Sequence, residues 1–239
     1  MILNGKGFLN MNDPKIDLII SHPIHLTYPL WMNFIHNNRE RFNKVIVIFT
    51  FMNAGSGDYR KFVSDALSKD NVVCIDNDEV LAQDDWRNIA INKALKYSNS
   101  EWVWFTEQDF IPEGNFWVEI EDFMKRVDVF GYYQDARLHP CCIFIKRELL
   151  DKTSKNFGVV KDELDHFGKF QQELEKKDIM IGVIPSYLGE HMNGLSQNMY
   201  MLQLGQEPNY NPEDFKEYCK KCLELPIHPD FEKLFKAYV

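Results

Sequence analysis

The sequence lacks the features that mark a membrane or secreted protein. No apolar run approaches the roughly 20 residues that a membrane-spanning helix needs. The first residues, MILNGKGFLNMNDPK, contain no basic stretch followed by an apolar run, as a secretory signal would. Internal repeats and low-complexity segments are also missing. We therefore expect a soluble, cytoplasmic protein with no membrane partner.

A surplus of positive charge is missing too. The 239 residues include 27 lysines and arginines against 36 aspartates and glutamates, which gives a formal net charge of −9. Non-specific binding of nucleic acid needs a basic surface, so nucleic acid is not favoured as the main partner. The apolar share of 45% and the aromatic share of 14% instead indicate a globular protein of one large domain or two merged ones.

Cysteine is scarce and odd in number. Five cysteines fit reduced thiols better than a disulfide framework. Cys219 and Cys222 form a CxxC, a spacing that binds zinc in some proteins. Together with Phe215 and Leu223, however, they occupy the i, i+4, i+7 and i+8 positions of one helix face. No second CxxC or histidine pair completes a zinc site, and HPCC at 139–142 is a remote candidate. We interpret this CxxC as a buried helix face.

Short apolar runs alternate with helical patterns along the first half of the chain. The expected strands are 16–21, 44–51, 71–76 and 102–105, and the expected helices between them are 58–69 and 84–98. Strands that are apolar throughout, joined by helices in a β-α-β-α-β order, favour an α/β fold. Its sheet should be mainly parallel, with helices on both faces.

The second half is less regular. The pattern predicts helices at 114–127, 160–177 and 213–224, and strands at 129–133, 141–147 and 179–185. We expect a catalytic domain over residues 1–190, with halves at 1–112 and 113–190. Residues 191–239 should form a C-terminal loop and helical extension, acting as a lid or appendage.

Two carboxylates follow the apolar run WVWF, at the strand end where sheets of this kind bind ligands. Residues i and i+2 of an extended chain point to the same side, so Glu107 and Asp109 can approach one hard cation such as Mg²⁺ or Mn²⁺. Such a cation would neutralise the charge that grows on a departing nucleoside diphosphate. Acids after a strand also occur as loop carboxylates facing water, and this short pattern alone does not separate the two.

The stretch AINKALKYSNSEWVWFTEQD, residues 90–109, resembles the central signature of family 2 glycosyltransferases of the GT-A fold. In that family a helix beginning A-R-N-x-G runs into G-E-Y-I-x-F-x-D-x-D. Without a gap, Asn92 falls on the signature asparagine, Phe105 on the phenylalanine, and Glu107 with Asp109 on the D-x-D. The resemblance implies a Rossmann-like sheet of the nucleotide-diphospho-sugar transferase superfamily.

The match also has departures. Ile91 stands where arginine is usual, although Arg87 lies one helical turn away, and Glu107 replaces the first aspartate of the D-x-D. The resemblance covers about residues 16–192 and is strongest at 87–112.

In inverting members of this family an acid at the start of a later helix takes the proton of the acceptor hydroxyl. The resemblance implies that Asp165 is this general base, with Asp162 and Glu163 as alternatives. These acids could equally just begin a helix and favour its dipole. The resemblance further implies that His191, in a late loop, supplies a third metal ligand beside Glu107 and Asp109.

On the same resemblance, the nucleotide should lie near the ends of the first strands. The implied donor-binding residues are Ser21, Asp76, Asp78, Arg87, Asn92 and Glu107. Asp76 is the best placed of these to accept hydrogen bonds from the uracil imide or a ribose hydroxyl. The loop SHPIHLTYP lacks a glycine-rich phosphate cradle, which excludes a P-loop or dinucleotide-binding site there.

These observations predict a glycosyltransferase that uses Mn²⁺ or Mg²⁺ and moves a hexosyl or pentosyl group from a nucleotide diphosphate donor, foremost a UDP-sugar. The acceptor hydroxyl could belong to a glycan, a small molecule, a protein or a hydroxylated nucleic-acid base. One alternative is a GT-A-like protein that binds nucleotides or glycans without catalysis. Another is a sugar-1-phosphate nucleotidyltransferase, which the missing phosphate loop disfavours.

Overall fold

The computed structural model describes residues 15–21, 28–49, 72–76, 86–107, 110–134, 137–160, 167–191, 212–225, 229–237 and 239. Its strands are β1 (Ile16–Ser21), β2 (Phe42–Phe49), β3 (Val72–Asp76), β4 (Trp102–Glu107), β5 (Phe110–Pro112), β6 (Val129–Gln134), β7 (Arg137–Lys146), β8 (Gly182–Val183) and β9 (Gly189–His191). Its α-helices are α1 (Tyr28–Asn37), α3 (Trp86–Leu95), α4 (Phe116–Arg126), α5 (Arg147–Asp151), α6 (Gly168–Lys176), α8 (Pro212–Leu223) and α9 (Pro229–Lys236), and the 3-10 turns are η1 (Arg39–Arg41) and η3 (Ser186–Leu188).

Seven of the strands form one sheet in the order β3-β2-β1-β4-β7-β6-β8. The first four are parallel to one another, and β7 runs antiparallel between β4 and β6. Strand β4 is buried along its whole length, as expected for a central strand covered on both faces. The predicted mainly parallel sheet is therefore confirmed.

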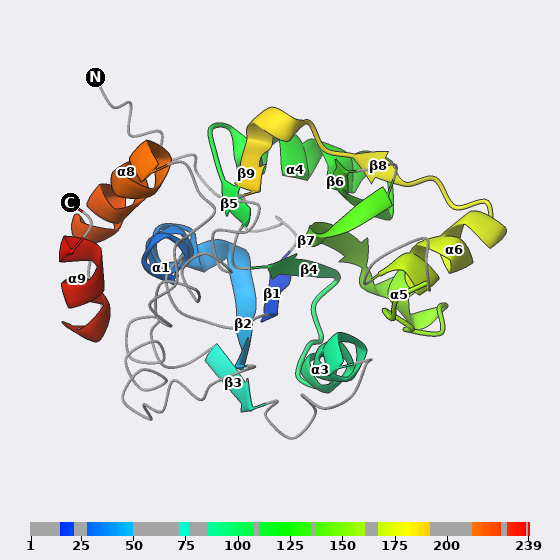
Figure 1. The fold of residues 1–239 in the computed structure, drawn as a ribbon. Helices are drawn as coiled ribbons and strands as arrows, with labels where there is room; N and C mark the ends of the chain where they lie inside the picture. The colour runs from blue at the N-terminus through cyan, green and yellow to red at the C-terminus, as the bar shows by residue number, and fades with distance from the viewer. Residues whose placement is uncertain are drawn as a thin grey trace.

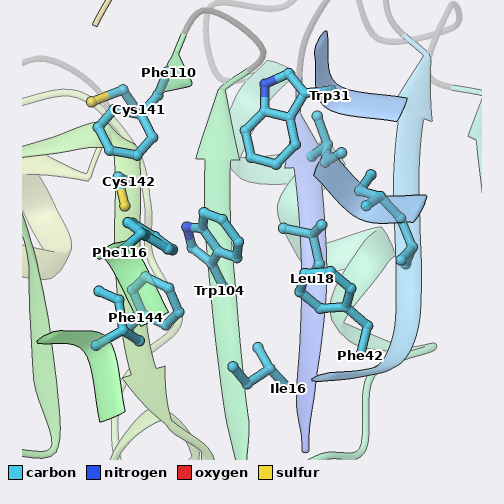
Figure 2. Close-up of a cluster of buried hydrophobic side chains, with 14 of the residues drawn as sticks. Ile16, Leu18, Trp31, Phe42, Trp104, Phe110, Phe116, Cys141, Cys142 and Phe144 are labelled. Carbon is cyan, nitrogen blue, oxygen red and sulfur yellow. The ribbon is translucent and has the colours of Figure 1, made fainter. Parts of the chain in front are cut away.

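Helices cover both faces of this sheet (Figure 1). One face packs against α1, α4, α8 and α9, and the other against α3, α5 and α6. The first face is rich in aromatic rings around Trp104, which stacks on Phe144 at 4.8 Å between ring centroids and meets Trp31 at 5.5 Å (Figure 2). Offset and edge-to-face pairs of this kind add to the free energy gained by burial.

The C-terminal extension contributes to the same core. Cys219 and Cys222 of α8 and Phe235 of α9 are fully buried in the cluster that contains Trp104. The expected helix at 213–224 is thus present, with the CxxC on its buried face. None of the described helices is long and apolar enough to cross a membrane.

Two expected elements differ from the structure. The helix predicted over 160–177 is wrong at its start, because α6 begins only at Gly168 and Phe167 has a left-handed backbone with φ of 68°. That conformation interrupts a right-handed helix. The strand predicted over 179–185 is reduced to the two residues of β8. The helix expected at 58–69 lies outside the described residues.

A buried carboxylate ties the strands together at the amino ends of β1 and β2. Asp17 is fully buried, and one of its oxygens accepts from the backbone N–H groups of Asn99 (2.6 Å) and Ser100 (2.7 Å) and from the Ser98 hydroxyl (2.8 Å). The other oxygen accepts from Asn43 of β2 and from the Ser100 hydroxyl. These contacts fasten the loop before β4 to the neighbouring strands, opposite the edge where the predicted site lies.

Candidate functional site

The carboxyl ends of the parallel strands bring three of the predicted site residues to one edge of the sheet. Ser21, the last residue of β1, is the register partner of Glu107, the last residue of β4. On the other side of β1, Asp76 ends β3 as the partner of Phe49 in β2. Ser21, Asp76 and Glu107 therefore lie along one edge, which in α/β sheets is the ligand-binding edge.

Glu107 is the most completely described of these residues. It is only 5% exposed, although it ends a strand. The neighbouring Thr106 donates its hydroxyl hydrogen to the Cys141 carbonyl at 2.7 Å, which fastens the end of β4 to β7. Burial of a carboxylate is costly unless cations or hydrogen-bond donors surround it. The end of β4 therefore holds a buried carboxyl group at the ligand-binding edge, where a cation or hydrogen-bond donors would offset the cost of its burial.

A second, two-stranded sheet pairs the backbone of His191 with that of Phe110. Strand β5 begins one residue after Asp109, and its first residue, Phe110, is the register partner of His191 in β9. Asp109 and the side chain of His191 lie outside the described residues, so this placement concerns the backbone. It brings segments more than 80 residues apart in the sequence to the same point.

The close approach of β9 to β5 depends on a glycine. A Cβ atom at Gly189 would lie 2.2 Å from the Cζ atom of Phe110 and 2.7 Å from its Cε2 atom. The φ angle of Gly189 is −174°, an extended conformation that any residue adopts, so the constraint is one of space. The Phe110 ring therefore lies directly on the backbone of β9, two residues before His191.

The predicted general bases Asp165, Asp162 and Glu163 lie outside the described residues. The chain on either side of them is described. The Phe167 backbone N–H donates to the Phe157 carbonyl at 2.8 Å, and the Lys169 N–H donates to the Gly158 carbonyl at 3.2 Å.

The aromatic rings of Phe157 and Phe167 both pack on strand β4. The Phe105 ring lies 5.5 Å from that of Phe157 and 5.4 Å from that of Phe167. Since Phe105 is two residues before Glu107, Phe157 and Phe167 both lie close to the end of β4.

Asn92, predicted to bind the donor, makes internal contacts. Its side-chain N–H₂ group donates to the Asn88 carbonyl (2.9 Å), the Asn88 Oδ1 atom (3.1 Å) and the Lys155 carbonyl (3.0 Å). Asn88 Oδ1 in turn accepts from the Phe157 backbone N–H at 2.9 Å. Asn88 was not singled out from the sequence. The only indication of its role in the sequence is its position four residues before Asn92, on the same face of the helix. Of the remaining donor-binding candidates, Asp78 and the side chains of Ser21, Asp76 and Arg87 lie outside the described residues.

The remote zinc candidate HPCC forms an irregular stretch of β7 instead. The pairing of β6 with β7 shifts register between Gly131 and Tyr133, and a Cβ atom on Gly131 would lie 2.5 Å from the Cys142 carbonyl oxygen. His139 is buried, and its Nδ1 atom accepts from the Cys141 backbone N–H at 3.2 Å. Within the described part of the chain, no three His, Cys, Asp or Glu residues are grouped as a metal site.

The buried thiols of Cys142 and Cys219 are poor metal ligands and poor nucleophiles in the folded protein. Burial raises the pKa of Cys142 far above its usual range and raises the pKa of Cys219 to about 12. Because the thiolate is the reactive and metal-binding form, both groups remain protonated at neutral pH. This agrees with the interpretation of the CxxC as a core element.

No family model matches the sequence, and no curated protein matches it. Solved structures do match the fold. A mannosyltransferase from Pyrobaculum calidifontis, solved with GDP-Man and Mn²⁺, is 12% identical over 95% of this chain and 69% of its own, with a TM-score of 0.60.

Glucosyl-3-phosphoglycerate synthase from Mycobacterium tuberculosis matches over a smaller part. Its structure with Mn²⁺, UDP and phosphoglyceric acid is 12% identical over 82% of this chain and 80% of its own, with a TM-score of 0.50. Its complex with phosphoglyceric acid alone gives a TM-score of 0.51 at 13% identity. The chain thus has the GT-A fold that its sequence predicted.

Proposed function

We propose that this protein is a metal-dependent glycosyltransferase that takes a sugar from a nucleoside diphosphate donor, foremost a UDP-sugar. The observation that supports this most is that the β1–β4 pair ends, and the β5–β9 pair begins, at one edge of a GT-A sheet. Glu107 ends β4 beside Ser21, and His191 in β9 stands opposite Phe110, directly after Asp109. Carboxylate and imidazole groups are both suited to bind a divalent cation.

Glu107, Asp109 and His191 would hold Mn²⁺ or Mg²⁺, the ions bound in the solved structures of similar fold. When bound, such an ion neutralises the negative charge on the departing diphosphate. Ser21 and Asp76, at the ends of β1 and β3, would bind the nucleoside, with Asp78 and Arg87 as further donor-binding residues. Asp76 is suited to accept hydrogen bonds from the base or ribose.

Asp165 would take the proton of the acceptor hydroxyl, with Glu163 or Asp162 as alternatives. The support is that Phe157 and Phe167, which flank these acids in the sequence, both pack on Phe105 close to the end of β4. The transferred group would be a hexose or a pentose. The acceptor is a hydroxyl of a glycan, a small molecule, a protein or a modified nucleic-acid base, and the net charge of −9 disfavours the last.

Loss of catalysis with retention of nucleotide or glycan binding is the second candidate function. The replacement of the first aspartate of the D-x-D by Glu107 favours it, because a longer side chain shifts the carboxylate relative to a metal. This candidate predicts that donors bind without turnover.

Calorimetric titration of UDP, and then of GDP, tests the proposed donor site. The protein is titrated with Mn²⁺ and with EDTA, as wild type and as the Asp109→Ala, Glu107→Gln and Glu113→Gln variants. Glu113 is exposed just beyond β5 and serves as the matched control for loss of an acid. We expect binding that requires Mn²⁺, weakens about tenfold or more in the first two variants, and is unchanged in the third. Binding of neither nucleotide, or binding indifferent to metal and Asp109, would overturn the proposal.

A further inference from the structure

Two asparagines of α3 connect this helix to the segment that precedes the predicted bases. Asn88 and Asn92 lie one turn apart, and the Asn92 side-chain N–H₂ group donates to the Asn88 Oδ1 atom at 3.1 Å. Both side chains also form hydrogen bonds with residues outside the helix. Asn92 donates to the Lys155 carbonyl at 3.0 Å, and Asn88 accepts from the Phe157 N–H at 2.9 Å. We call these contacts the amide clasp.

The orientation of both amides is determined by their neighbours. The Asn92 nitrogen faces three oxygen acceptors, two on Asn88 and one on Lys155, so only the N–H₂ end of this amide fits there. The Asn88 Oδ1 atom faces two donors, from Asn92 and Phe157, so only an acceptor fits there. Lys155 has a left-handed backbone with φ of 53°, and this turns the chain between the two contacts.

The clasp acts on described residues that flank the predicted bases in the sequence. Phe157, held by Asn88, accepts at its carbonyl from the Phe167 N–H at 2.8 Å. A second contact fastens the same segment from the other side, because the Ser154 N–H donates to the Glu173 carboxylate of α6 at 3.0 Å. Residues 154–158 are therefore held between α3 and α6, beside Phe105 of the strand that ends in Glu107.

We infer that Asn88 and Asn92 are positioning residues for the transfer step, an inference that rests on the proposed function. In that step the base takes the acceptor proton while the acceptor oxygen bonds to the sugar carbon. As that bond forms, the bond between the sugar carbon and the diphosphate oxygen breaks, and the diphosphate leaves with its electron pair. The clasp fixes where the stretch containing Asp162, Glu163 and Asp165 leaves Phe157 and returns at Phe167. A base displaced by about 1 Å can slow a reaction by as much as a hundredfold.

This role differs from the donor contact implied by the sequence resemblance for Asn92. A donor-binding asparagine would weaken nucleotide binding when replaced. A positioning asparagine lowers kcat and leaves nucleotide affinity and the KM for the donor unchanged. A purely structural asparagine lowers thermal stability and leaves the kcat of the folded protein unchanged.

The test compares Asn88→Ala, Asn88→Asp, Asn92→Asp and Asn37→Ala with the wild type. Asn88→Asp keeps the acceptor for Phe157 and Asn92, whereas Asn92→Asp sets a carboxylate against three oxygens. Asn37 is the matched control, since its amide makes the same i to i+4 contact with Asn33 on an exposed face of α1. Because the acceptor is not identified, water serves as the hydroxyl group, and each variant is assayed with Mn²⁺ for hydrolysis of UDP-glucose to UDP and of GDP-mannose to GDP. Calorimetry gives the affinity for UDP and GDP, and thermal unfolding shows the folded fraction.

We expect kcat to fall about tenfold or more in Asn88→Ala and Asn92→Asp, with nucleotide affinity within about threefold of the wild type. Asn88→Asp should recover most of the loss, and Asn37→Ala should behave as the wild type. Unchanged kcat in folded Asn88→Ala and Asn92→Asp overturns the inference, as does a loss confined to nucleotide affinity. If the wild type binds UDP with Mn²⁺ but turns over neither donor, the inference fails while the donor site stands. Failure of nucleotide binding itself refutes the proposed function.

Discussion

His191 and Phe110 are register partners in the β5–β9 ladder, and Phe110 is the residue directly after Asp109. Partners in an antiparallel pair have Cα atoms about 4.5–5.5 Å apart. The ladder therefore brings a histidine from the late part of the chain to the segment that follows β4.

Replacement of His191 by alanine should weaken metal-dependent binding of UDP by about tenfold or more, because one of the proposed metal ligands is lost. Calorimetry at several Mn²⁺ concentrations measures the effect, and part of the loss should be recovered at high Mn²⁺. His36→Ala is the matched control, since His36 is exposed in the last turn of α1. UDP affinity that is equal in both variants would remove His191 from the metal site.

Replacement of Gly189 by alanine should disturb the same site indirectly. The added methyl group would overlap the Phe110 ring, with a contact of 2.2 Å to Cζ, so the ring or β9 has to move. We expect a loss of about 1–3 kcal/mol in the free energy of unfolding together with weaker Mn²⁺-dependent UDP binding.

The Gly114→Ala variant is the control that distinguishes steric overlap with Phe110 from backbone strain. Gly114 has φ of 58° with open space around its Cα atom, so alanine there costs about 1–2 kcal/mol of backbone energy without any contact to Phe110. Its UDP affinity should equal that of the wild type. Equal UDP affinity in Gly189→Ala as well would show that the position of β9 does not matter for the metal.

Most of the sheet could be predicted from the sequence because its signals are local. The run from Trp102 to Thr106 is apolar or β-branched throughout, and such a run is typical of a central strand. The order of strands and helices then determined the parallel arrangement. The carboxylate Glu107 could be placed at the ligand-binding edge on the same grounds.

The contacts around the site could not be predicted, since each depends on residues far apart in the sequence. Strands β5 and β9 have three residues each, too short to show a period, and β5 ends in Pro112. The left-handed conformation of Phe167, the residue before α6, could not be expected from the sequence, because phenylalanine rarely adopts positive φ. Asn92 was predicted from its place in a signature, and its contact with Lys155, 63 residues away, appears only in the folded chain.

The four cysteines whose side chains the structure describes should be unreactive in the folded protein. Cys141, Cys142, Cys219 and Cys222 are buried, and burial raises the pKa values of Cys142 and Cys219. Since the thiolate is the attacking species, labelling with iodoacetamide at pH 8 should be slow at these positions and complete after unfolding in guanidinium. Peptide mass spectrometry assigns the labelled sites. Rapid labelling of Cys219 and Cys222 in the native protein would mean that α8 opens from the core.

Replacement of Asp17 by asparagine should destabilise the fold by about 2–3 kcal/mol at pH 7. Burial alone would raise the pKa of Asp17, but hydrogen bonds from the Ser100 backbone, the Ser98 and Ser100 hydroxyls and the Asn43 amide outweigh it and hold the pKa below its usual value. An asparagine N–H₂ group would instead face these donors. Urea unfolding of both proteins measures the difference.

The lowered pKa also determines how this difference depends on pH. The stabilisation by the Asp17 carboxylate is present above its unfolded pKa of about 3.9 and is lost as the pH falls through the lower folded value. The gap in unfolding free energy between wild type and Asp17→Asn should therefore be constant from about pH 7 to 5 and shrink below about pH 4. Asp122→Asn is the matched control, because Asp122 pairs with Arg126 on the surface and should cost no more than about 1 kcal/mol at pH 7. A gap for Asp17→Asn that persists unchanged to pH 3 would show that the buried carboxylate contributes through its shape and not through its charge.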